Sequence, residues 1–160
     1  MEQNLKAEKV VSVLRKKQWR ISFAESCTGG LAAAELVGVS GASDVFDASF
    51  VTYANDAKIA LLGVQPESIA RHGVVSEQVA LQMAIGAAKK ANAQVGVGIS
   101  GIAGPDGGVP GKPVGTVCFG FQIGTEAFAI TKHFGNIGRN AVRAQSVAFV
   151  YETLAEKLDQ

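Results

Sequence analysis

The sequence predicts an α/β protein, a three-layer α/β/α sandwich around a mixed, mostly parallel sheet. Over the first 100 residues, segments with helical periodicity alternate with short strand-like segments, which is typical of a sheet covered by helices. After residue 114, two strand patterns are separated only by Gly124-Thr125, which indicates a hairpin and makes the sheet mixed. At 160 residues the chain is expected to form a single domain, residues 1–160.

The N-terminal part predicts a helix, a strand, a glycine turn and a second helix. Residues 4–18 place apolar side chains among lysines at amphipathic spacing. Residues 21–24 alternate as a strand does, and an Ala-rich helix follows at 31–36. Ser26 or Thr28, in the turn between them, is a candidate N-cap of this helix.

The next stretch predicts a strand and two short helices. Residues 46–53 have the aromatic and β-branched content of a strand. Asn55 is a plausible N-cap for a short helix that Gly63 ends, and Pro66 begins another.

The second half of the chain predicts a helix, three strands and a closing helix. Ser76 should cap the first helix. The strands are expected at residues 94–99, 115–123 and 126–134, and the closing amphipathic helix at 139–158. Between the first two strands, residues 100–112 form a long glycine-rich loop that we expect to be functional.

Composition favours a soluble cytoplasmic protein. The net charge of +1 gives no electrostatic signal for nucleic acid or acidic lipid. The N-terminus has charges where a signal peptide needs an apolar core, and no apolar run approaches the ~20 residues of a membrane span. Cys27 and Cys118 lack metal-type spacing, so neither a metal nor a disulfide is expected. The apolar helices and the hairpin make a homo-oligomer, a dimer or higher, the expected assembly.

The sequence does not carry the known motifs for dinucleotide binding, for phosphate binding by a P-loop, or for a hydrolase nucleophile elbow. Gly96, Gly98 and Gly101 match G-x-G-x-x-G, but the first two lie inside a predicted strand instead of opening a helix. Gly111-Lys112 lacks the other residues of a phosphate-binding P-loop, and Ser26 lacks the flanking glycines of a hydrolase elbow.

The turn at residues 25–30 carries the candidate chemistry. It holds two possible nucleophiles, Ser26 and Cys27, beside backbone N–H groups that could stabilise an oxyanion. The sequence has only two histidines, His72 and His133, so a lysine is the simplest base. Lys58 would need a pKa lowered by burial or by a nearby cation. The alternatives left open are a Ser that only caps a helix and a Lys that is solvated at a helix start.

Ligands of open α/β sheets gather beyond the carboxyl ends of the parallel strands. We therefore expect a group of polar side chains at that edge, made of Ser26, Tyr53, Asn55, Lys58 and Ser100.

Six sequence motifs together point to a known protein family. They are AESCTGGL (24–31), FVTYANDAKIALLGV (50–64), HGVVSEQVALQMAIGA (72–87), GVGISGIAGPDGG (96–108), KPVGTV (112–117) and RNAVR (139–143). With them, residues 5–158 resemble the CinA C-terminal domain family, in its stand-alone form. The enzymatic members of that family are nicotinamide-nucleotide amidases. The resemblance implies hydrolysis of the carboxamide of nicotinamide mononucleotide (NMN) to nicotinic acid mononucleotide and ammonia, in pyridine nucleotide recycling, without a metal or other cofactor.

The resemblance also implies site residues. Ser26 corresponds to the nucleophile, Lys58 to its base and Tyr53 to a third catalytic residue. The implied substrate-binding residues are Asn55, Ser100, Gly101, Gly104, Lys112 and Arg143, and the mechanism that we expect for this reaction adds Glu25, Thr28, Gly29 and Gly30. In this scheme the N–H groups of residues 28–30 bind the oxyanion, and backbone N–H groups of residues 100–108 bind the phosphate, assisted by Lys112 or Arg143. Glu25 either faces the pyridinium or makes hydrogen bonds within the turn. Asn136–Gly138, just before Arg139, depart from the family pattern.

A binding module without catalysis, which keeps the pocket for regulation, is the alternative function. It would be expected to have lost Ser26 or Lys58, and both are present.

Overall fold

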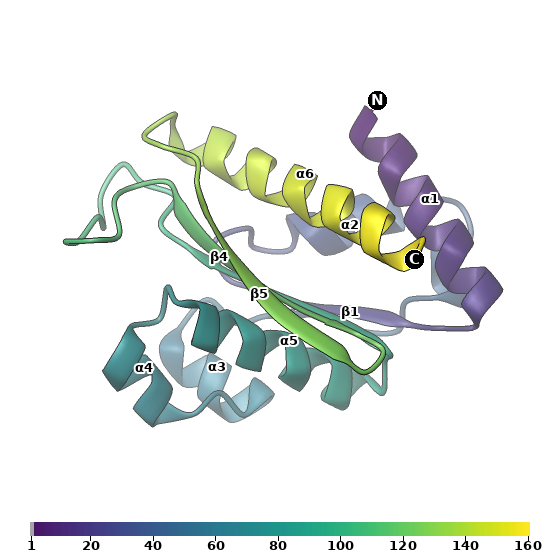
Figure 1. Cartoon of the computed structure of the whole chain (residues 1–160), viewed down its shortest axis with the longest axis horizontal. Helices are drawn as coiled ribbons and strands as arrows, with labels where there is room; N and C mark the ends of the chain where they lie inside the picture. The colour runs from purple at the N-terminus through teal and green to yellow at the C-terminus, as the bar shows by residue number, and fades with distance from the viewer. Residues whose placement is uncertain (1) are drawn as a thin grey trace.

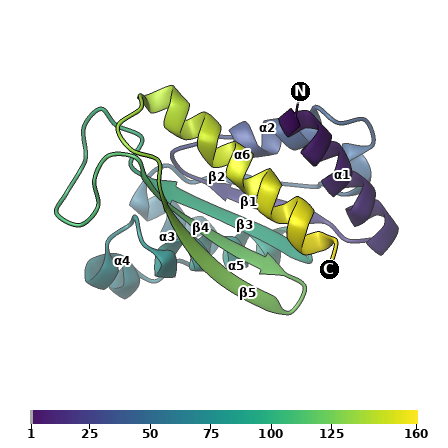
Figure 2. The same ribbon diagram turned by 45° about the horizontal axis from the view of Figure 1, so that its top comes forward.

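The computed structural model describes residues 2–160 and contains one five-stranded sheet in the order β2-β1-β3-β4-β5 (Figures 1 and 2). The strands are β1 (Ile21–Glu25), β2 (Phe50–Val51), β3 (Val95–Gly101), β4 (Thr116–Ile123) and β5 (Glu126–His133). β1 pairs in parallel with β2 and β3, whereas the β3–β4 and β4–β5 pairs are antiparallel. Four of the five strands therefore point the same way, which confirms the predicted mixed sheet.

Helices cover both faces of the sheet, as predicted. One face carries α1 (Glu2–Lys17), α2 (Leu31–Val37) and α6 (Arg139–Leu158), and a short 3-10 turn, Ala42–Asp44, follows α2 (Figure 1). The other face carries α3 (Asn55–Leu62), α4 (Pro66–His72) and α5 (Glu77–Ala91). Figure 2 shows α6 lying diagonally across its face of the sheet. Within residues 2–160, no helix is both long and apolar enough to cross a membrane.

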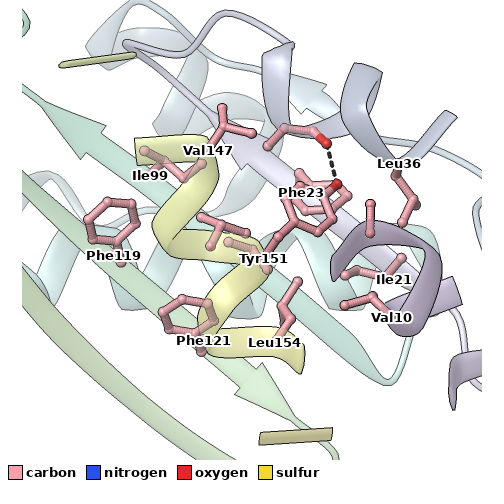
Figure 3. Packing of buried hydrophobic residues seen from close by; sticks show 14 of the residues in the cluster. Val10, Ile21, Phe23, Leu36, Ile99, Phe119, Phe121, Val147, Tyr151 and Leu154 are labelled. Carbon is pink, nitrogen blue, oxygen red and sulfur yellow. Dashed lines mark hydrogen bonds between the residues drawn. The ribbon is translucent and has the colours of Figure 1, made fainter. Parts of the chain in front are cut away.

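The main core lies between the sheet and the α1–α2–α6 layer. Phe23, Phe119 and Phe121 of the strands are fully buried against Tyr151 and Leu154 of α6 (Figure 3). The Tyr151 hydroxyl donates a hydrogen bond to the carbonyl of Ala32 in α2, so that α6 and α2 are joined inside this core.

Gly96 and Gly98, the first two glycines of the G-x-G-x-x-G string, allow α5 to pack closely on β3. A Cβ at Gly96 would lie 2.1 Å from the carbonyl oxygen of Ala84, and one at Gly98 would lie 2.1 Å from that of Ala80. Both carbonyls belong to α5, which therefore approaches β3 more closely than any side chain would allow. This agrees with the rejection of a dinucleotide site.

The strand predicted at 46–53 is much shorter than expected. Only Phe50 and Val51 form β2, and Phe46 makes an isolated bridge to Ile21. Between them the Ser49 hydroxyl donates to the carbonyl of Phe23 and accepts from its N–H, so a side chain replaces the backbone ladder.

Two other local predictions are wrong in detail. The N-cap of α3 is Ala54 rather than Asn55. Ser100 and Gly101 belong to β3, opposite Cys118 and Val117 of β4, rather than to the following loop. The predicted cap of α5 is confirmed, because Ser76 accepts a hydrogen bond from the N–H of Val79.

Candidate active site

Ser26 directly follows β1 and begins the turn to α2. Its N–H donates to the carbonyl of Ile99 in β3 (3.1 Å), and its own carbonyl accepts from the N–H of Gly29 (3.1 Å). Gly29 and Gly30 have φ of +59° and +109°, conformations that favour glycine over other residues. The turn therefore holds Ser26 at the carboxyl edge of the sheet, between two parallel strands.

The Lys58 amino group is the hydrogen-bond partner of the Ser26 hydroxyl. Lys58 Nζ lies 3.0 Å from Ser26 Oγ, 2.7 Å from the carbonyl oxygen of Thr52 and 3.1 Å from that of Tyr53. Only 1% of Lys58 is exposed, so the alternative of a solvated lysine is wrong. Burial lowers the pKa of Lys58 from its ordinary value of 10.5, while the neighbouring Cys27 opposes this shift.

This geometry suits a neutral amine. A neutral amino group has two N–H donors and one lone pair. In the structure Nζ is the donor to all three oxygens, which a protonated amine can satisfy with its three N–H groups; in the neutral form the carbonyls of Thr52 and Tyr53 would accept both N–H groups, and the lone pair would face the Ser26 hydroxyl. Lys58 can therefore act as a base toward Ser26.

Cys27 is a poor rival nucleophile in this setting. Its side chain is 6% exposed, and burial raises the pKa of the thiol to about 11. The nearby Arg143 lowers this pKa and Glu25 raises it, both by smaller amounts. Because the thiolate is the reactive form, Cys27 is almost entirely unreactive near neutral pH.

A cavity of about 260 Å³ lies beside the turn. It is lined by Cys27, Tyr53, Val74, Val75, Arg139 and several residues of the 101–107 segment, which include Gly101 and Gly104. This segment begins the loop between β3 and β4, which projects beyond the sheet in Figures 1 and 2.

Arg139 lines this cavity, and the sequence analysis gave it no role. Its guanidinium donates to the carbonyl of Gly104 (2.7 Å) and to the hydroxyl of Tyr53 (2.8 Å). One signal could have identified it: a cation in the first turn of a helix opposes the helix dipole, so it needs another reason to be there.

Tyr53 contacts Lys58 through its backbone instead of its phenol. Its carbonyl accepts from Lys58, while the exposed phenol reaches Arg139. The Asn55 side chain is exposed and makes no hydrogen bond within residues 2–160.

Glu25, the last residue of β1, is fully buried. It accepts hydrogen bonds from the hydroxyl of Thr28 (2.6 Å) and from the N–H groups of Ala32 (2.9 Å) and Ala33 (3.0 Å). Hydrogen bonding within the turn, one of the two expected alternatives, is therefore what the structure shows. Glu25 supplies the cap of α2 that Ser26 or Thr28 was expected to supply, because neither of these two side chains caps the helix.

Lys112 lies apart from the Ser26 turn. Its amino group donates to the carbonyl of His72 (2.5 Å), and both residues line a second cavity of about 460 Å³ that His133 also borders. Ser100 is buried and donates to the carbonyl of Val74 (2.8 Å). Within residues 2–160, no cluster of three His, Cys, Asp or Glu side chains could hold a metal ion.

Arg143 contacts the turn through two of the turn's backbone carbonyl groups. It donates to the carbonyl oxygens of Cys27 (2.9 Å) and Thr28 (3.4 Å), and its remaining terminal nitrogen donates to Asn140 (3.0 Å). The structure thus brings Ser26, Lys58, the Tyr53 backbone and Arg143 together around one turn.

The model of the CinA C-terminal domain matches residues 3–158 of this chain. The chain belongs to the CinA C-terminal domain family. Two relatives in this family are both named nicotinamide-nucleotide amidohydrolase PncC. The protein from Escherichia coli (strain K12) is 44% identical over 154 residues, which cover 96% of this chain and 93% of the relative. The protein from Enterobacter agglomerans is 47% identical over 142 residues, which cover 89% of this chain and 87% of the relative.

A solved structure supports the same family assignment. The competence/damage inducible protein CihA from Agrobacterium tumefaciens matches with a TM-score of 0.95 and 39% identity, over 100% of this chain and 97% of that chain. The sandwich fold is therefore the fold of the family.

Proposed function

We propose that this chain is a nicotinamide-nucleotide amidase that hydrolyses the carboxamide of NMN to nicotinic acid mononucleotide and ammonia. The observation that carries the proposal is the 3.0 Å contact between the Ser26 hydroxyl and the buried amino group of Lys58. The two amidohydrolase relatives, aligned over most of their length, supply the substrate class. The reaction would serve pyridine nucleotide recycling.

In the first step, neutral Lys58 takes the proton of Ser26, and Oγ attacks the carboxamide carbon. The tetrahedral intermediate then carries a negative oxygen that needs N–H donors. The Gly29 N–H is already bonded to the Ser26 carbonyl, whereas among residues 2–160 the N–H groups of Cys27, Thr28 and Gly30 donate to no backbone carbonyl. Of these residues, only Cys27 also lines the cavity, so we assign its N–H to the oxyanion.

In the second step, protonated Lys58 gives its proton to the departing nitrogen, and ammonia leaves as the C–N bond breaks. Water, deprotonated by Lys58, then attacks the nicotinoyl ester; the bond to Oγ breaks, Lys58 returns the proton to Ser26, and nicotinic acid mononucleotide leaves. Tyr53 is the alternative donor of the proton to the departing nitrogen, because its phenol accepts from Arg139 and lines the cavity, which leaves its own O–H able to donate.

The nucleotide would occupy the cavity beside Cys27. Its phosphate is an anion, and Arg139 is the cation that lines this cavity. Lys112 is already bonded to the His72 carbonyl beside the second cavity, which makes it a weaker candidate for the phosphate than the sequence implied.

The first experiment measures ammonia release from NMN in chelator-treated buffer by the wild type, Ser26→Ala and Cys27→Ala. We expect turnover in the wild type, loss of at least about a thousand-fold in Ser26→Ala, and substantial activity in Cys27→Ala. Circular dichroism would check that each variant is folded.

One other result would refute the amidase activity, and another would refute only the assignment of Ser26 as nucleophile. Binding of NMN without turnover by the wild type would favour the binding module. Loss of activity in Cys27→Ala together with activity in Ser26→Ala would make the thiol the nucleophile.

A further inference from the structure

Two arginines of α6 approach the site from different sides. Arg139 lines the 260 Å³ cavity, whereas Arg143 is not among the residues that line it. The guanidinium of Arg143 is instead directed to the carbonyl oxygens of Cys27 and Thr28, the two residues that follow Ser26. A Cβ at Gly29 would lie only 3.5 Å from Nη2 of Arg143, so the side chain lies directly against the turn.

The two carbonyl contacts act on the turn through its peptide planes. Because a peptide unit is planar, holding a carbonyl also fixes the direction of the N–H of the next residue. The Thr28 carbonyl shares its peptide with the Gly29 N–H, which donates to the carbonyl of Ser26. The Ser26 carbonyl in turn shares its peptide with the N–H of Cys27.

These contacts form a chain from the Arg143 guanidinium through two peptide groups to the Cys27 N–H. In such chains each hydrogen bond polarises the next donor, and a charged donor at one end strengthens the effect. Among residues 2–160, the Cys27 N–H donates to no backbone carbonyl, and it lies against its own thiol, whose pKa it lowers. It is therefore a polarised donor that a reacting oxygen can accept from in place of this weak sulfur acceptor.

We propose that Arg143 is a positioning residue of the amidase reaction, which holds and polarises the turn after Ser26 so that the Cys27 N–H stabilises the oxyanion. This inference rests on the proposed amidase function. It also reassigns Arg143, because a side chain whose guanidinium is directed to the carbonyls of the turn is not a binding group for the substrate phosphate.

The test compares kcat and KM for ammonia release from NMN in Arg143→Met and Arg143→Lys. Arg15→Met is the matched control, because Arg15 lies in an exposed ion pair with Asp44. Loss of one direct oxyanion donor costs about 100- to 1,000-fold in kcat, so for this indirect contact we expect Arg143→Met to lower kcat about 10- to 100-fold and to change KM less than about two-fold. Arg143→Lys should recover part of kcat, because an ammonium group can still donate to one carbonyl.

A rise in KM with kcat retained would overturn the inference and make Arg143 a substrate-binding residue. An unchanged kcat would overturn it as well. If Arg143→Met fails to fold, Arg143→Lys alone decides, through the same separation of kcat from KM. Failure of the amidase proposal has a different signature: the wild type would release no ammonia from NMN.

Discussion

Burial has opposite effects on the two reactive groups beside Ser26. It lowers the pKa of the Lys58 amine and raises the pKa of the Cys27 thiol, because in each case burial disfavours the charged form. The neutral amine is a base, and the neutral thiol is not a nucleophile. One desolvated environment therefore favours the serine as nucleophile over the adjacent cysteine.

The pH dependence of turnover follows from Lys58. Below its lowered pKa, Lys58 is protonated and cannot accept the Ser26 proton, whereas above that pKa it is neutral. We expect kcat for NMN to rise with pH and to reach a plateau, with the midpoint below 10.5, the ordinary pKa of lysine. A steady-state pH profile measures this. Lys58→Arg, which stays protonated, should be inactive at every pH, and a midpoint at or above 10.5 would contradict the role of Lys58.

At the scale of elements, the start of α2 depends on the carboxylate at the end of β1. Gly30, the N-cap of α2, has no side chain, so the first N–H groups of the helix need another acceptor. Glu25 provides it from the preceding strand, at the positive end of the helix dipole. The same carboxylate accepts from Thr28, so it orders the whole turn between Ser26 and the helix.

Replacing this carboxylate by an amide should destabilise the protein. In Glu25→Gln, the new NH2 group would face an N–H or O–H donor, and one buried donor would lose its acceptor. We expect the free energy of unfolding to fall by about 1–3 kcal/mol, measured by urea denaturation. Glu152→Gln, an exposed change on α6, should stay within about 0.5 kcal/mol of the wild type. Equal stability of Glu25→Gln and the wild type would mean that Glu25 is not the cap.

The sequence predicted those elements whose signals are local. Periodicity located α6, Ser76 located the start of α5, and the glycine turn located Ser26 at the edge of the sheet. Ser49 was missed because its replacement of a ladder depends on Phe23, 26 residues away in the sequence. Likewise, spacing alone could not show that Lys112 lies beside a different cavity or that Arg143 donates to carbonyl groups of the turn. Both placements depend on packing between residues that are far apart in the sequence.

At the scale of the whole molecule, α6 ties the C-terminal part of the chain to the N-terminal part that carries Ser26. It packs on the sheet through Tyr151 and Leu154, bonds α2 through the Tyr151 hydroxyl, and brings Arg139 and Arg143 to the turn and its cavity. Burial raises the pKa of Tyr151 well above 10, and Glu25 and Glu35 raise it further, so its hydroxyl stays protonated and donates.

Removal of that hydroxyl tests the link between the two helices. Tyr151→Phe keeps the ring but leaves the Ala32 carbonyl without its donor from α6. We expect a loss of about 1–2 kcal/mol in the free energy of unfolding, measured by urea denaturation. Tyr53→Phe, which removes an exposed hydroxyl, is the control and should leave stability almost unchanged. A Tyr151→Phe variant as stable as the wild type would show that packing alone joins α6 to α2.

The close contact between α5 and the sheet has a consequence for mutational scanning. Gly120 of β4, like Gly96 and Gly98, has an α5 carbonyl oxygen just over 2 Å from where a Cβ would lie, so almost any replacement would push the helix off the sheet. In a saturation screen in which growth depends on the proposed amidase activity, these three glycines would therefore be as intolerant as Ser26. The amount of folded protein in the cell would separate the two classes, because replacements at the glycines should deplete it and Ser26→Ala should not.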